Sequence, residues 1–374
     1  MHTTLEDFLK LATPGVRGLR PYQPGKPLAE LARELGITDA IKLASNENPL
    51  GPSPLALAAI QAQLPELTRY PDASGFELKQ KLAQRHALTP DRITLGNGSN
   101  DILEMLAQAF LTAEQGAVFD QNGFAVYALA TQARGAIAQV SPSLSATAAM
   151  PYGHDVERML ALITAQTRLL FIANPNNPTG TWLGQAALKH LLDHCPPQVI
   201  VVLDEAYAEY VDAPDYPQTR PWLDIYPNLV ITRTFSKAYG LAGLRLGYAL
   251  SHPALANILN RIRQPFNANS LALAAAAAVL DDTAYLQRSI EANRAAKQQW
   301  QTALAQLGLM ALPSQTNFLC VQVTRNAAEV YQSLLREGII VRPVGPGLPQ
   351  FLRISMGLPA ENDRAIQALQ KVLA

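Results

Sequence analysis

The stretch TFSKAYG (234–240) decides the fold, because it places Lys237 just after a short apolar run at 230–232. Such a run predicts a buried strand, and α/β proteins bind their ligands beyond the carboxyl ends of such strands. A lysine at this position can form a Schiff base with a carbonyl group. Thr234, Ser236 and the nearby Arg245 add two hydroxyls and a guanidinium, which together suit a phosphate. Taken alone, the stretch fits a surface lysine in a polar turn better than it fits a catalytic lysine, because Ser-Lys is a common pair.

Three further strand ends carry polar residues at the same expected edge of the sheet. One apolar run leads into Asp204, whose carboxylate can serve a metal, a ribose or a protonated ring nitrogen, or can simply cap a helix. Another leads into NPNNPTG (174–180), a rigid turn from which Asn177 can reach the same edge. The stretch GNGSN (96–100) opens a helix whose free N–H groups can bind phosphate oxygens, although it matches neither a Walker A loop nor GxGxxG.

The order of apolar patterns predicts the organisation of the chain. Short apolar runs alternate with helical patterns between residues 91 and 251, which indicates a mostly parallel sheet covered by helices on both faces. Longer helices and a few strands follow, as in a smaller α+β domain. The proline- and glycine-rich start predicts an extended arm interrupted by one short helix at 28–35. We therefore expect an N-terminal arm (1–45), a large domain (46–260) and a small C-terminal domain (261–374), with a long linking helix at about 284–307.

Composition excludes several classes of protein. Of 374 residues, 48% are hydrophobic and 16% charged, which rules out a disordered chain. The 30 basic residues match the 30 acidic ones, and a net charge of zero argues against a dedicated nucleic-acid binder. With only Cys195 and Cys320, we expect neither disulfides nor a metal site, and a reducing, cytoplasmic location. The longest apolar run, 271–280, is too short to span a membrane, and we expect no signal peptide.

Taken together, the four strand ends resemble the aspartate-aminotransferase-like superfamily of pyridoxal-phosphate (PLP) enzymes, fold type I, over residues 46–357. The resemblance implies PLP as cofactor, a large domain with a mostly parallel seven-stranded sheet, and a smaller α+β domain. It implies that Lys237 forms the Schiff base, that Asp204 holds the pyridinium nitrogen protonated, and that Asn177 and Tyr207 donate to the phenolic oxygen of the ring. The other cofactor contacts that it implies are a phosphate cup and a stacking aromatic: Gly98, Ser99, Asn100, Thr234, Ser236, Arg245 and Phe124.

The turn before Phe124 departs from the family pattern. Asn122-Gly123 stand where the family commonly has Pro-Thr or Pro-Ser, which leaves the conformation of this turn open. Phe124 itself fits either a ring that stacks on the cofactor or a residue of the core.

Further motifs narrow the resemblance to the histidinol-phosphate aminotransferases. They are RPYQPGKP (20–27), LASNENP (43–49), RYPD (69–72), QPFNAN (264–269) and GIIVRP (338–343). The resemblance implies that Arg353 binds the anionic group of the substrate and that Tyr22 and Asn46 line the substrate. It also implies a homodimer in which Tyr70 reaches the PLP phosphate of the neighbouring subunit. Both tyrosines also fit simple packing roles.

The activity that this resemblance implies is amino transfer between L-histidinol phosphate and 2-oxoglutarate, a step of histidine biosynthesis. Two alternatives stay open on the same frame, an aromatic-amino-acid aminotransferase and a threonine-phosphate decarboxylase, because side chains of the pocket decide between them. A PLP-binding regulator would need a DNA-binding segment or a basic patch, and we expect neither.

Overall fold

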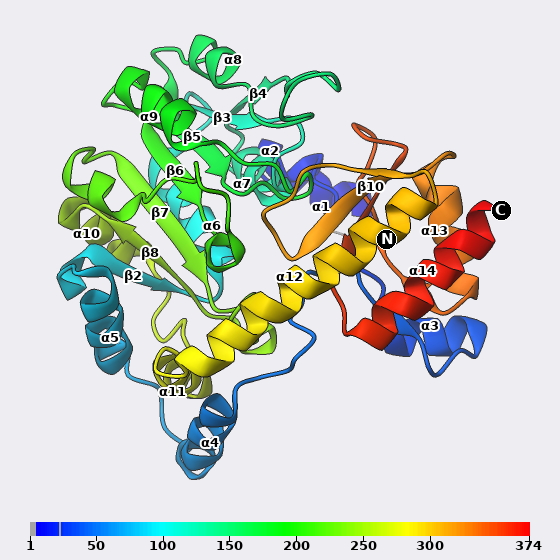
Figure 1. Ribbon diagram of the computed structural model, residues 1–374. Coiled ribbons are helices and arrows are strands. Elements are labelled where there is room, and N and C mark those ends of the chain that lie inside the picture. Colours follow the sequence, from blue (N-terminus) through cyan, green and yellow to red (C-terminus); the bar gives the residue numbers. More distant parts are fainter. Residues whose placement is uncertain (1–4, 22–23) are drawn as a thin grey trace.

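The computed structural model describes residues 5–21 and 24–374. A seven-stranded sheet in the order β2-β8-β7-β6-β5-β3-β4 lies at the centre of the larger part (Figure 1). Neighbouring strands pair in parallel, except that β8 pairs antiparallel with β2 and β7. The mostly parallel sheet predicted from the sequence is therefore confirmed. The strands are β2 Ile93–Gly96, β3 Gly116–Asp120, β4 Ile137–Ser141, β5 Thr167–Ala173, β6 Ile200–Asp204, β7 Leu229–Thr234 and β8 Gly247–Ser251.

Helices cover both faces of this sheet, because side chains along each strand alternate between two cores. On β6, for example, Leu203 belongs to one apolar cluster and Val202 to the other. The first cluster takes in α4 Pro54–Gln63, α5 Phe76–His86, α8 Val156–Ala161, α9 Gln185–His194 and α11 Ser270–Val279. The second takes in α6 Ser99–Phe110, α7 Ala125–Ala133 and α10 Pro253–Ile262.

The C-terminal part has its own sheet and apolar core. Its four strands lie in the order β12-β13-β10-β9, and its helices pack over them. The long helix α12 joins the two cores, since Tyr285 near its start is buried in the larger core and Trp300 in the smaller one (Figure 1). The elements are α12 Thr283–Gln306, β9 Met310–Ala311, β10 Phe318–Gln322, α13 Ala327–Arg336, β12 Arg342–Pro343, β13 Phe351–Ser355 and α14 Pro359–Leu373.

The N-terminal segment contains more helix than the extended arm predicted from its prolines. Residues 5–17 form α1 Leu5–Leu11 and α2 Pro14–Arg17, and Pro14 is the first residue of α2, a position at which proline is tolerated. Helix α3 Leu28–Leu35 matches the predicted helix. The strand β1 Ile41–Lys42 then pairs in parallel with β11 Ile339–Ile340, which fixes the segment to the C-terminal part.

The described part of the chain also contains five short 3₁₀ helices: η1 Leu64–Glu66, η2 Pro90–Arg92, η3 Ala208–Tyr210, η4 Arg220–Asp224 and η5 Ala242–Leu244. Within residues 5–21 and 24–374, no helix is long and apolar enough to cross a membrane. The domain boundaries at residues 45 and 260 stay a prediction. Helix α11, which follows the second boundary, packs against α4 in the larger core.

Candidate active site

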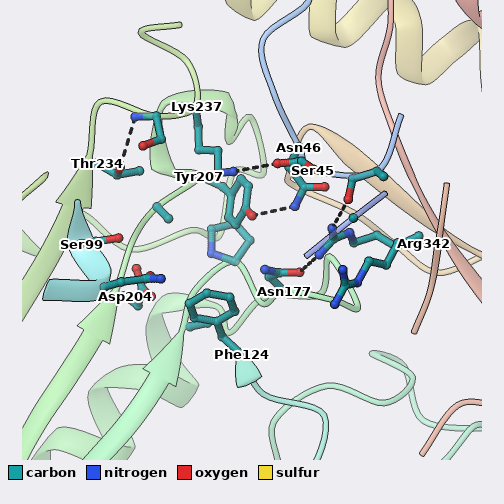
Figure 2. A pocket seen from close by; sticks show the side chains of 18 of the residues that line it. Ser45, Asn46, Ser99, Phe124, Asn177, Asp204, Tyr207, Thr234, Lys237 and Arg342 are labelled. Atoms are coloured by element: carbon teal, nitrogen blue, oxygen red, sulfur yellow. Dashed lines mark hydrogen bonds between the residues drawn. The ribbon is translucent and has the colours of Figure 1, made fainter. Parts of the chain in front are cut away.

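Several loops meet in a cavity of about 270 Å³ at one edge of the large sheet. The carboxyl ends of β5, β6 and β7 open into it, and so does the start of α6 after β2. Because β8 runs antiparallel, Arg245, which lies two residues before the strand begins at Gly247, comes to the same edge. The cavity brings together most of the residues predicted from the sequence: Asn46, Ser99, Asn100, Phe124, Asn177, Asp204, Tyr207, Thr234, Ser236, Lys237, Arg245 and Arg353. Figure 2 shows ten of the lining side chains with labels, arranged around one space.

Lys237 extends into this cavity from the turn after β7. Its Nζ donates to the carbonyl oxygen of Ser45 at 3.1 Å and lies 5.8 Å from the centre of the Tyr207 ring. Burial, with a smaller contribution from the positive charge of Arg353, lowers the pKa of the Lys237 amine to about 7. A substantial fraction of the amine is therefore uncharged at neutral pH, as nucleophilic and base chemistry requires.

Asp204 lies at the end of β6 and is only 4% exposed. Tyr127 Oη donates to its Oδ2 at 3.1 Å, and Thr232 Oγ1 donates to its Oδ1 at 3.1 Å. Burial raises the pKa of the Asp204 carboxyl to about 6, while the two hydroxyls act in the opposite direction. A cationic partner in the cavity would stabilise the ionised form of this carboxylate.

The opposite wall carries donors that the surrounding structure orients. Asn177 Oδ1 accepts a hydrogen bond from Arg353 Nη1 at 2.7 Å, so its amide donor group is left for the cavity. Tyr207 Oη accepts a hydrogen bond from Asn46 Nδ2 at 2.8 Å. Asn46 is itself 1% exposed, and its Oδ1 accepts from Ser355 Oγ at 3.1 Å. Asn46 therefore links the cavity to the C-terminal sheet, and its predicted contact with substrate stays a prediction.

A cradle for a phosphate lies at the start of α6. Gly98 has φ +84°, and a Cβ at this position would lie 2.5 Å from Arg245 Nη2, so only glycine leaves room for the guanidinium. Arg245 Nη1 donates to Ser236 Oγ at 3.4 Å, and the Ser236 N–H donates to Thr234 Oγ1 at 3.1 Å. The helix start, two hydroxyls and a guanidinium thus converge where an anion can be held.

The sequence motifs gave no role to several residues that line the cavity or contact its lining. Arg342, on β12, sits opposite Arg353 on β13 in the sheet register, and both guanidiniums reach the cavity. Arg342 belongs to the GIIVRP motif, which was the available signal in the sequence. Its place beside Arg353, however, depends on the pairing of β12 with β13, which the sequence does not show. Ser45, which holds Lys237, and Tyr127, which holds Asp204, were missed for the same reason.

Two predicted residues lie elsewhere. Tyr70 is 82% exposed, does not line the cavity, and stacks on Phe266 with the ring centres 4.6 Å apart. Tyr22 lies outside the described residues.

Comparison with known proteins places the chain among its relatives. Residues 38–369 match the family model "Aminotransferase class I and II". The chain is 58% identical, over 99% of its length and 100% of the relative, to histidinol-phosphate aminotransferase 2 of Pseudomonas aeruginosa. It is 57% identical, over 98% of its length and 99% of the relative, to the protein of that name from Pseudomonas fluorescens Pf0-1. The chain belongs to the histidinol-phosphate aminotransferases.

A solved structure of this family supports the same assignment. The histidinol-phosphate aminotransferase of Sinorhizobium meliloti, crystallised in complex with pyridoxal-5'-phosphate, superimposes with a TM-score of 0.89 at 31% identity. The match covers 96% of this chain and 97% of that one. The predicted family and fold class are therefore confirmed.

Proposed function

We propose that this protein is a PLP-dependent aminotransferase that moves an amino group between L-histidinol phosphate and 2-oxoglutarate. The observation that carries the proposal is the charge layout of one cavity. An anion cradle at Gly98 and Arg245 borders this cavity, and Arg342, Arg353 and Lys237 line it as well. Both the cofactor and the substrate carry phosphate, and such a site needs two separate sets of cations.

The residues of the cavity fit PLP. The cradle of Ser99, Ser236 and Arg245 would hold its phosphate, and Asp204 would hold its ring nitrogen in the protonated form. Asn177 and Tyr207 would donate to its phenolic oxygen. When bound, PLP supplies an aldehyde that carries the amino group and a ring that withdraws electrons from the substrate.

The chain's own groups would perform the remaining tasks. Lys237, whose pKa is about 7, would accept the proton from the substrate Cα. It would then return this proton to C4′, the cofactor carbon that carries the amino group. The ionised Asp204 would keep a proton on the ring nitrogen, and Tyr127 and Thr232 stabilise that ionised state. Arg353 and Arg342 would bind the phosphate of histidinol phosphate in one half-reaction and the dicarboxylate in the other.

We also propose a homodimer with shared active sites, located in the cytoplasm. Large apolar side chains are exposed along residues 50–76, and Phe266 beside Tyr70 is 40% exposed. Exposed apolar surface of this extent is typical of an interface, and Figure 1 shows α4 standing out from the rest of the molecule. Tyr70 would then reach the cofactor phosphate of the partner. Two buried, unpaired cysteines suit a reducing compartment.

Half-reaction rates with five amino donors test this function. Histidinol phosphate should bleach the absorption band of the bound cofactor, and 2-oxoglutarate should restore it. Histidinol, which lacks the phosphate, should fall in kcat/KM by ~10⁴, because a site built for a polar group strongly rejects an analogue without it. A higher kcat/KM for phenylalanine or tyrosine would instead indicate an aromatic aminotransferase. Release of CO₂ from threonine phosphate would indicate the decarboxylase.

A further inference from the structure

The turn that carries Phe124 borders two cavities. The first is the active-site cavity of about 270 Å³. A second cavity of about 350 Å³ is lined by residues 119–125 of the same segment, by Val344 and by residues 346–348. Van der Waals contacts are lost wherever a surface faces a void. Phe124 itself packs against the second apolar cluster and edge-on against Tyr127, so polar contacts must supply the rest of the support for the turn.

Polar contacts to Asp120 fix this turn. Asp120 Oδ1 accepts from the backbone N–H of Asn122 at 2.7 Å and from Ser143 Oγ at 2.5 Å. The N–H of Gly123 donates to the Asp120 carbonyl oxygen at 2.9 Å. A Cβ on Gly123 would lie 2.9 Å from that same oxygen, so the Pro-Thr or Pro-Ser pattern common in the family does not fit this turn. The aspartate takes over the task that a rigid proline performs elsewhere.

The second carboxylate oxygen of Asp120 faces a buried histidine. His154 Nδ1 lies 3.5 Å from Asp120 Oδ2, and the two side chains are 2% and 0% exposed. Within the described part of the chain, neither of these two atoms has a hydrogen-bond partner. His154 Nε2 lies 2.9 Å from the carbonyl oxygen of Ala173, which can only accept, so this nitrogen carries a proton. His154 therefore lies between the Ala173 carbonyl oxygen on one side and the Asp120 carboxylate on the other.

The pair joins two segments that form the cavity. Asp120 ends β3 and begins the Phe124 turn, whereas Ala173 ends β5 and leads into the turn of Asn177. Asn176 Nδ2 adds a second link, since it donates to the carbonyl oxygen of Asn122 at 3.0 Å. Removing either side chain leaves buried polar groups of its neighbours without a partner, so the two segments depend on both residues.

We infer that Asp120 and His154 are positioning residues that hold Phe124 over the cofactor ring and keep it in register with the Asn177 turn. The inference rests on the proposed function, because it takes the ring to be that of PLP. Neither residue lines the active-site cavity. Their effect must therefore pass through Phe124 and Asn177.

Three substitutions test this inference. His154→Gln can keep a donor near the Ala173 carbonyl but loses the group that faces Asp120. Asp120→Ala removes the acceptor of the turn, and Asp120→Asn keeps an oxygen acceptor for it. We expect the first two to raise the dissociation constant of PLP by about 3- to 10-fold, the value of one aromatic contact. His154→Gln and Asp120→Ala should also weaken the circular dichroism of the bound cofactor. In Asp120→Asn, the dissociation constant of PLP and the circular dichroism should stay close to their wild-type values.

Trp300→Phe is the matched control, because it deletes a buried hydrogen bond to Asn362 in the C-terminal core, away from the cavity. It should lower the melting temperature of the apoprotein and leave PLP affinity and dichroism unchanged. Wild-type affinity and dichroism in His154→Gln would overturn the inference, and so would an equal loss of affinity in the control. If the wild-type protein itself forms no PLP adduct and transfers no amino group, the proposed function fails instead.

Discussion

Tyr127→Phe removes one hydroxyl next to Asp204 and leaves the surrounding packing in place. The Tyr127 ring is 1% exposed and stacks on Phe171, with the ring centres 4.9 Å apart and the planes 6° from parallel. Phenylalanine can occupy the same position with the same contacts. The substitution therefore isolates the hydrogen bond from Tyr127 Oη to Asp204 Oδ2.

The size of the effect follows from the state of this carboxyl. Burial already raises the pKa of Asp204 to about 6, and Tyr127 is the first of the groups that lower it. A hydrogen bond to a charged group contributes about 1.5–3 kcal/mol, and about 1.4 kcal/mol corresponds to one pH unit. The pyridinium of PLP favours the ionised carboxylate, so affinity falls as the pH drops through the pKa of Asp204. In Tyr127→Phe this fall should begin roughly 1 to 2 pH units higher.

The assay is a series of PLP titrations across neutral pH, read by quenching of protein fluorescence. Both proteins should carry Lys237→Ala, because the lysine titrates in the same range and would mask Asp204. The ionisable groups of PLP itself change with pH in the same way in both experiments. The displacement along the pH axis between the two affinity curves therefore reports the pKa of Asp204. Superimposable curves would refute the reasoning and would show that the hydroxyl does not control this carboxyl.

The remaining predictions concern the named catalytic groups and the dimer. Lys237→Ala should still bind PLP but form no adduct that borohydride reduces, as mass spectrometry would show, and turnover near the wild-type rate would exclude the Schiff-base role. Asp204→Asn should lose at least ~100-fold in kcat with little change in melting temperature, whereas unchanged turnover would make Asp204 a structural cap. Mixing Tyr70→Phe with Lys237→Ala protomers should give hybrid dimers more active than either parent, and a lack of complementation would count against a shared site. Arg342→Gln should raise the KM for histidinol phosphate by about 10-fold or more, the value of a hydrogen bond to a charged group, and an unchanged KM would remove Arg342 from the substrate site.

Local patterns were enough to predict most of the secondary structure. The predicted helix at 28–35 coincides with α3, and the apolar run at 230–232 lies within β7, because burial imposes a period on the sequence itself. The long helix predicted at about 284–307 is α12, Thr283–Gln306, so the prediction differs by one residue at each end, where the boundary depends on the cap and not on the apolar face. The pairing of β1 with β11 was not predicted, because nothing local in Ile41–Lys42 indicates a partner almost 300 residues away.

In the candidate site, the positions of catalytic groups could be predicted from the sequence, whereas their ionisation states could not. A strand that ends in an acid was enough to place Asp204 at the edge of the sheet, and the resemblance to PLP enzymes implied that the ring nitrogen is its partner. Its charge, however, depends on Tyr127 and Thr232, which lie 77 and 28 residues away in the sequence and meet it only in the folded protein. An identical strand end with other neighbours would hold the same carboxyl at a different pKa. A motif therefore indicates where a catalytic group lies, whereas the residues packed around that group decide whether it is ionised. For this reason the substitution of Tyr127 tests the mechanism more sharply than the substitution of Asp204.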